Sequence, residues 1–166
     1  YASIDATKIS TQIDALAAMR DKATGALSAT GTVSLLSLGY ESIGIDEGWE
    51  GCGLGVNGTV HYVNGTPAGD PQRFPDMPGL VAYGHSVGVK MGFYLNGCGC
   101  NEKVERLINY EGDVRATGAW GFDGVKIDSC GAQKNMTLYG ALINASGKAL
   151  VVENCHQGRN ITDGGD

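Results

Sequence analysis

The segment FDGVKIDSCG, from Phe122 to Gly131, is the part of the sequence that most directly indicates the fold. A short, largely apolar run ends at Asp128, and Lys126 stands two positions earlier. Side chains two residues apart lie on the same side of a strand, so these two charges share one face. The segment therefore predicts a buried strand with a polar carboxyl end, which is where parallel α/β folds bind their ligands.

Three more segments, at residues 39–46, 89–96 and 149–154, predict strands that also become polar or aromatic where they end. Polar residues often mark where a strand leaves the core, which would explain one or two such ends but not four. We therefore expect one shared pocket beyond the strand ends. The candidate pocket residues are Asp46, Glu47, Trp49, Tyr94, Asn96, Lys126, Asp128, Glu153 and Asn154.

Helical patterns separate the predicted strands. Apolar spacing predicts helices at residues 9–29 and 102–117, and Pro78 and Gly88 stand near the start and end of another at residues 74–88. The pattern also predicts a helix at residues 136–146 and half of a small hairpin at residues 60–63. Alternating strands and helices predict an α/β fold with a parallel sheet, in one domain because no linker interrupts the alternation.

The composition narrows the possible partners. The 166 residues carry a net charge of -6, with 12 basic and 18 acidic side chains, which argues against nucleic acids and anionic membranes. No apolar stretch is long enough for membrane insertion. Paired histidines, metalloprotease motifs and calcium loops are absent from the sequence, so we expect no metal and no cofactor. Carboxylates, amides, a lysine and aromatic rings are instead a mixture typical of carbohydrate sites.

Two features predict passage through the secretory pathway. The sequence holds five cysteines, which in a secreted chain predict disulfides, and the odd count leaves one without a partner in this sequence. It also holds five candidate N-glycosylation sites. We therefore expect a secreted, extracellular protein or one in a lysosome-like or vacuole-like compartment. The candidate glycosylation sites are Asn57, Asn64, Asn135, Asn144 and Asn160.

Three motifs in order, GYESIGIDEGW, VKMGFYLNGCGC and GFDGVKIDSCG, resemble the α-galactosidase and α-N-acetylgalactosaminidase family of retaining glycosidases, glycoside hydrolase family 27. The resemblance implies a (β/α)8 TIM barrel, of which residues 1–166 would form roughly half, about strands 2–5 of the catalytic domain. The N-terminal strand and the C-terminal half would then lie outside this chain. A longer chain or a partner subunit would complete the barrel.

The resemblance also implies roles for individual residues. Asp128 would be the catalytic nucleophile, and Lys126 would bind sugar hydroxyls and keep Asp128 ionised. The acid/base residue would lie outside this chain. Glu47 stands where the family usually has aspartate, which leaves the sugar open among galactose, N-acetylgalactosamine and arabinopyranose. The other implied substrate-binding residues are Asp46, Glu47, Trp49, Tyr94 and Glu153.

The family pairs a cysteine shortly after the second motif's tyrosine with the cysteine that follows the nucleophile. This implies a Cys100–Cys130 disulfide, with Cys98 as the alternative partner of Cys130. If Cys100 pairs with Cys130, a Cys52–Cys98 disulfide is possible. The disulfide partner of Cys155 would then be a cysteine beyond this sequence.

Two functions follow as hypotheses. The first is a retaining exo-glycosidase that removes terminal α-galactosyl-type residues by double displacement, with a carbohydrate as its substrate. The second is a non-catalytic barrel that serves as a carbohydrate-binding or structural module in a secreted or cell-surface glycoprotein assembly. Substitutions relative to the family, such as Asn96 where aspartate is common, favour the second hypothesis.

Overall fold

The computed structural model describes residues 3–95, 98–100 and 102–155. Four parallel strands pair in the order β1-β2-β3-β4, and a helix lies between each pair of consecutive strands. The predicted α/β alternation is therefore confirmed. The elements are α1 (Ala6–Ala17), β1 (Ser42–Gly44), α2 (Met77–Ser86), β2 (Lys90–Leu95), α3 (Leu107–Trp120), β3 (Gly124–Asp128), α4 (Met136–Ser146) and β4 (Val151–Cys155), with short 3-10 turns at Leu36–Leu38, Val56–Gly58 and Cys98–Cys100.

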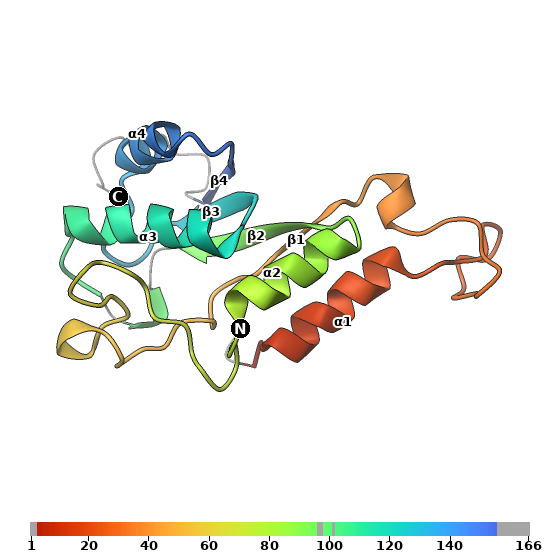
Figure 1. Ribbon diagram of the computed structural model, residues 1–166, viewed down its shortest axis with the longest axis horizontal. Helices are drawn as coiled ribbons and strands as arrows, with labels where there is room; N and C mark the ends of the chain where they lie inside the picture. Colours follow the sequence, from red (N-terminus) through yellow and green to blue (C-terminus); the bar gives the residue numbers. More distant parts are fainter. Residues whose placement is uncertain (1–2, 96–97, 101, 156–166) are drawn as a thin grey trace.

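The helices pack side by side in chain order and cover one face of the sheet (Figure 1). The strand residues on that face, such as Phe93 and Ile127, are 1% and 0% exposed and form the core with the helices. Phe93 lies between Trp49 and Phe122, with ring centroids 4.5 Å away in each case. Alternate residues of each strand point to the other face of the sheet, which the helices do not cover.

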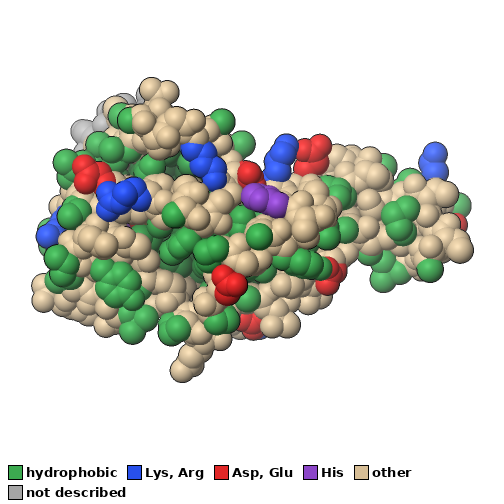
Figure 2. Space-filling model, viewed as in Figure 1, with side chains coloured by type: hydrophobic (Ala, Val, Ile, Leu, Met, Phe, Trp, Pro, Cys, Tyr) green, Lys and Arg blue, Asp and Glu red, His purple; other side chains and the backbone are tan. Residues whose placement is uncertain are grey.

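The first helix is shorter than predicted, because the chain turns sharply after Ala17. The side chain of Asp21 accepts hydrogen bonds from the backbone of Thr24 and Ala23, and Gly25 adopts a φ of 71°. Such side-chain contacts to the backbone compete with helical hydrogen bonds. Residues 18–40 instead form an arm that extends away from the sheet, at the right of Figures 1 and 2. Its exposed apolar side chains are Met19, Leu27, Leu38 and Tyr40.

The other predicted elements are confirmed, α4 with the predicted bounds and the rest with shifted ends. Helix α2 begins where the Asp76 side chain accepts from the backbone N–H of Gly79, and α4 begins where Asn135 caps Leu138 in the same way. The predicted hairpin is present as the bridge between His61 and Pro67. Among the described residues, none of the helices is both long and apolar enough to span a bilayer.

The loop after β1 docks on helix α3 through two glycines. A side chain on Gly112 would lie 1.8 Å from the backbone oxygen of Gly65, and one on Gly65 would lie 1.8 Å from that of Ile108. Arg115 adds a hydrogen bond of 2.7 Å to the backbone oxygen of Asn64. The hairpin and the helix therefore meet backbone to backbone, which leaves no room for a β-carbon.

We expect Gly112→Ala to destabilise the complete protein by about 2 kcal/mol or more, because the added methyl group overlaps the backbone of the hairpin. The matched control is Gly118→Ala on the same helix, where a β-carbon meets nothing within 4 Å. There, the higher helix propensity of alanine is expected to stabilise by up to about 1 kcal/mol. Chemical denaturation measures both values, and equal values would contradict the close docking.

Candidate active site

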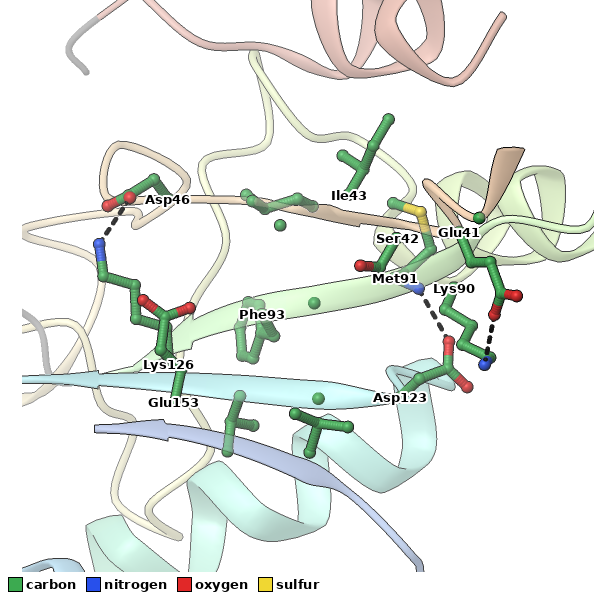
Figure 3. A pocket seen from close by; sticks show the side chains of 17 residues that line it. Glu41, Ser42, Ile43, Asp46, Lys90, Met91, Phe93, Asp123, Lys126 and Glu153 are labelled. Carbon is green, nitrogen blue, oxygen red and sulfur yellow. Dashed lines mark hydrogen bonds and ion pairs between the residues drawn. The ribbon is translucent and has the colours of Figure 1, made fainter. Parts of the chain in front are cut away.

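A cavity of about 490 Å³ lies on the face of the sheet that the helices leave open (Figure 3). Gly44, Gly92 and Gly124 occupy one row across β1, β2 and β3 in the strand register. Because these positions carry no side chains, the middle of the cavity floor is open. Charged side chains stand at both ends, with Glu41, Lys90 and Asp123 near the strand starts and Asp46, Lys126 and Glu153 near the strand ends (Figure 3).

Lys126 and Asp46 form an ion pair at the carboxyl end of the sheet. The Lys126 Nζ donates to Asp46 Oδ2 at 2.7 Å, and the two side chains are 23% and 31% exposed. Burial opposes the charge of the ammonium group, but the hydrogen bond and the charge of Asp46 outweigh it and raise the pKa of Lys126. Glu153 is the β4 register partner of Lys126 and stands beside it in Figure 3. The strand ends thus bring together one cation and several acids.

Asp128 ends β3, on the same side of the strand as Lys126. The Tyr94 hydroxyl donates to Asp128 Oδ2 at 3.0 Å, and the backbone N–H of Ser129 donates to Asp128 Oδ1 at 2.7 Å. Burial and the charge of Asp128 raise the pKa of Tyr94 well above its usual range. Tyr94 therefore stays a neutral phenol and donates a hydrogen bond to the carboxylate, so each Asp128 oxygen accepts from at least one donor.

Tyr94 and Trp49 are buried and do not reach the open cavity. Tyr94 is 0% exposed, and the Lys126 Nζ lies 5.5 Å from the centre of its ring. Trp49 is 2% exposed, and its Nε1 donates to the backbone oxygen of Tyr94 at 2.9 Å. In this structure the Trp49 ring is closed to a ligand. Its contacts instead fix the strand end that carries Tyr94.

The favoured cysteine pairing is wrong, whereas Cys98, the alternative partner of Cys130, does pair with it. The disulfides are Cys98–Cys130 and Cys52–Cys100, and neither Cys100–Cys130 nor Cys52–Cys98 forms. The 3-10 turn at Cys98–Cys100 explains the exchange, because it turns the two sulfur atoms toward different neighbours. Cys98 Sγ lies 3.1 Å from the Tyr94 hydroxyl, beside Asp128 and Cys130, whereas Cys100 is buried against the loop after β1. Such disulfides are typical of proteins that fold in an oxidising compartment.

The remaining predicted residues differ in their surroundings. Asn96 and Asn160 lie outside the described residues. Cys155 has no disulfide partner in the described chain, and it is the β4 register partner of Asp128. Asn57, Asn64 and Asn144 are exposed, whereas Asn135 is half-buried and its side chain caps α4. The three exposed asparagines offer the more accessible positions for a glycan.

A buried polar network around His61 could not be predicted from sequence patterns. His61 Nδ1 contacts Glu102 Oε1 at 2.7 Å, and its Nε2 contacts Asp113 Oδ1 at 3.0 Å. The Tyr139 hydroxyl donates to Asp113 Oδ2 at 2.6 Å. His61 is 41 residues from Glu102 and 52 residues from Asp113 in the sequence, so no local motif predicts these contacts. The network joins the loop after β1, the loop after β2 and helices α3 and α4.

A second residue that sequence reasoning missed is Glu50, which directly follows the IDEGW segment. It is 3% exposed, and its Oε2 accepts from the backbone N–H of Gly48 at 2.7 Å. Burial raises the pKa of its carboxyl group, and the charge of Glu47 acts in the same direction. The one feature of the sequence that could have indicated a role for Glu50 is its proximity to Asp46 and Glu47. A charged residue at the end of a strand gave no indication that it would be buried.

Comparison with known proteins gives one consistent result. The family described as Alpha galactosidase A (Melibiase_2) matches residues 21–163. A probable α-galactosidase B of Aspergillus fumigatus is 31% identical over 137 residues, which cover 81% of this chain and 28% of the relative. An α-galactosidase A of Cellvibrio japonicus is 29% identical over 138 residues, which cover 78% of this chain and 32% of the relative. The chain thus spans only a fraction of its relatives' length.

Solved structures share the fold. α-Galactosidase I of Mortierella vinacea matches with a TM-score of 0.65 and 23% identity, over 92% of this chain and 37% of that one. The α-galactosidase of Saccharomyces cerevisiae, solved with raffinose, matches with a TM-score of 0.64 and 16% identity, over 91% and 31%. The four-stranded parallel sheet is part of a (β/α)8 barrel, as predicted. On the match of its sequence to the family, the chain belongs to the α-galactosidase A (melibiase) family of glycoside hydrolase family 27.

Proposed function

We propose that the complete protein is a retaining exo-glycosidase that hydrolyses terminal α-galactosyl-type residues. The observation that carries this proposal is the placement of Asp128. It ends a central strand with a tyrosine hydroxyl and a backbone N–H on its oxygens, two residues beyond Lys126. The names of the relatives support an enzyme rather than a non-catalytic binding or structural module.

In this mechanism Asp128 is the nucleophile. Its carboxylate attacks the anomeric carbon while the bond to the leaving oxygen breaks, which forms a glycosyl ester on Asp128. A carboxylic acid outside the described residues protonates the leaving oxygen. The same group then takes a proton from water, which attacks the anomeric carbon and releases Asp128. Two inversions at this carbon give net retention. The tyrosine donor on Asp128 weakens as the ester forms and strengthens again as the carboxylate returns.

The other charged side chains bind the sugar. Lys126 and Asp46 present a donor and an acceptor side by side, which suits neighbouring hydroxyl groups of a galactosyl ring. Glu153 supplies a further acceptor at the same end of the sheet. Glu47 directly follows Asp46 in the chain, and we assign it to sugar binding as well. Two solved relatives of similar fold are named for N-acetylgalactosamine and β-L-arabinopyranose, so the assay should include all three sugars. The two disulfides support secretion or delivery to a vacuole-like compartment.

Trapping the covalent intermediate tests this proposal. The complete protein is incubated with an activated fluorosugar of α-galacto configuration, digested with a protease and analysed by mass spectrometry. We expect the glycosyl adduct on the peptide that contains Asp128, because fluorine slows hydrolysis of the ester more than its formation. An adduct on another carboxylate would overturn the assignment of Asp128. Turnover with inversion of the anomeric carbon would overturn the double displacement.

A further inference from the structure

The turn after β1 is held from within by a buried acid. Glu50 is 3% exposed, and its Oε2 accepts from the backbone N–H of Gly48 at 2.7 Å. Gly48 has a φ of 113°, a conformation that favours glycine. The preceding peptide is held as well, because the backbone N–H of Glu47 donates to Asp46 Oδ1 at 2.8 Å. The backbone around Glu47 is therefore held by two hydrogen bonds, one from its own N–H and one from the N–H of Gly48.

The other oxygen of Glu50 has no such partner. Glu50 Oε1 is buried, and it makes no hydrogen bond within the described residues. Arg73 is the nearby cation, but its Nε donates to Asp70 at 2.7 Å and its Nη2 reaches only the backbone oxygen of Glu50, at 3.4 Å. A carboxylate with one unpaired oxygen is unfavourable in a buried setting, and an adjacent acid makes it more so. The neutral acid is therefore the form that fits this site.

We propose that Glu50 is a positioning residue that, as a neutral carboxylic acid, orients Glu47 toward the bound sugar. This inference rests on the proposed function, which assigns Glu47 to sugar binding. The neutral acid accepts from Gly48 through one oxygen and carries its proton on the other. Ionisation of Glu50 would place a second negative charge beside Glu47, and repulsion would shift the turn away from its binding geometry.

The proposal predicts a defined dependence on pH. The titratable and charged groups near Glu50 are Glu47, Arg73 and Tyr94. Burial, and to a lesser extent the charge of Glu47, raise the pKa of Glu50. The backbone N–H groups of Glu50 and Gly48 and the charge of Arg73 lower it, and the net direction is upward. Glu50 is neutral below this raised pKa and ionised above it. Sugar binding should therefore weaken as pH rises through the pKa of Glu50, which raises KM while kcat changes little.

The experiment compares Glu50→Gln and Glu50→Ala in the complete protein, with Asp21→Asn as the control at an exposed acid on the arm, outside the cavity. KM and kcat for an aryl α-galactoside are measured across a series of pH values. Glutamine mimics the neutral acid, so we expect Glu50→Gln to keep the low KM and to lose its rise with pH. Glu50→Ala should raise KM about tenfold because the Gly48 N–H loses its partner. A Glu50→Gln variant that keeps the wild-type pH profile would overturn the proposal.

An infrared measurement separates this proposal from the proposed function. The three substrates are the aryl glycosides of α-galactose, α-N-acetylgalactosamine and β-L-arabinopyranose. If the complete protein hydrolyses none of them, the proposed function fails. The protonation of Glu50 is then judged from the carbonyl stretch of a protonated carboxyl group. A band present in the wild type and absent in Glu50→Gln supports the neutral acid. The same spectrum in the wild type and in the variant would overturn it, whether or not the protein is active.

Discussion

Replacing Asp128 with asparagine is expected to lower kcat of the complete protein on an aryl α-galactoside by about 10⁴-fold or more. The amide has no negative charge with which to attack the anomeric carbon, so the glycosyl ester does not form. It retains the shape of the carboxylate, but its single oxygen can accept from only one of the two donors, the Tyr94 hydroxyl or the Ser129 N–H, and its NH2 group faces the other. Binding of the sugar should therefore change much less than turnover. Steady-state kinetics and inhibitor titration measure the two quantities separately.

A smaller replacement gives a more specific result. Asp128→Gly leaves a space in which an added azide ion can attack the anomeric carbon from the side that the carboxylate occupied. We expect azide to restore part of the turnover and to yield a galactosyl azide of inverted, β configuration. Asp21→Asn on the exposed arm serves as the control, and its kinetics should match those of the wild type. An α-configured azide, or turnover by Asp128→Asn close to that of the wild type, would exclude Asp128 as the nucleophile.

The fold was predictable because it depends on local patterns. Each strand is short and followed by polar residues, and α1, α2 and α4 each begin at a side chain that caps the helix. The strand expected within residues 122–131 is β3 (Gly124–Asp128), and the helix expected at residues 136–146 is α4, with the same bounds. The parallel order of the sheet follows from the helical crossovers alone. The site location follows in turn, because all four strand ends meet at one edge.

The failures share a physical cause, which is dependence on contacts distant in sequence. The family pattern favoured Cys100 over Cys98 as the partner of Cys130, but the turn between the two cysteines brings the sulfur of Cys98 to Cys130. The ring of Trp49 is buried because Phe93 and Trp120 pack against it, and a motif cannot show this. Glu102, where the pattern predicts a helix to begin, lies before α3 and contacts His61, a residue 41 positions away. Spacing within a motif carries no information on such partners.

Replacing His61 with alanine is expected to destabilise the complete protein by about 3–5 kcal/mol, because it leaves two buried carboxylates without their shared partner. Both acids contact the ring, at 2.7 Å and 3.0 Å, and the side chains of His61 and both acids are at most 4% exposed. The control is His85→Ala. The ring of His85 pairs with Asp123 at 2.7 Å, but its side chain is 42% exposed, so we expect a loss of about 1 kcal/mol or less. Chemical denaturation of both variants measures the difference.

The contribution of His61 should also depend on pH in a known direction. Burial opposes the imidazolium charge, but the hydrogen bonds to Asp113 and Glu102 outweigh it and raise the pKa of His61 to about 9. The unfolded value is lower, near 6.5, so folding favours the protonated ring. The stabilisation is therefore complete below about pH 6.5 and is lost as pH rises through about 9. The difference in unfolding free energy between wild type and His61→Ala should shrink accordingly. A difference that stays constant from about pH 6 to about pH 10 would mean that His61 is neutral in the folded protein, and that one of its two acids holds the proton instead.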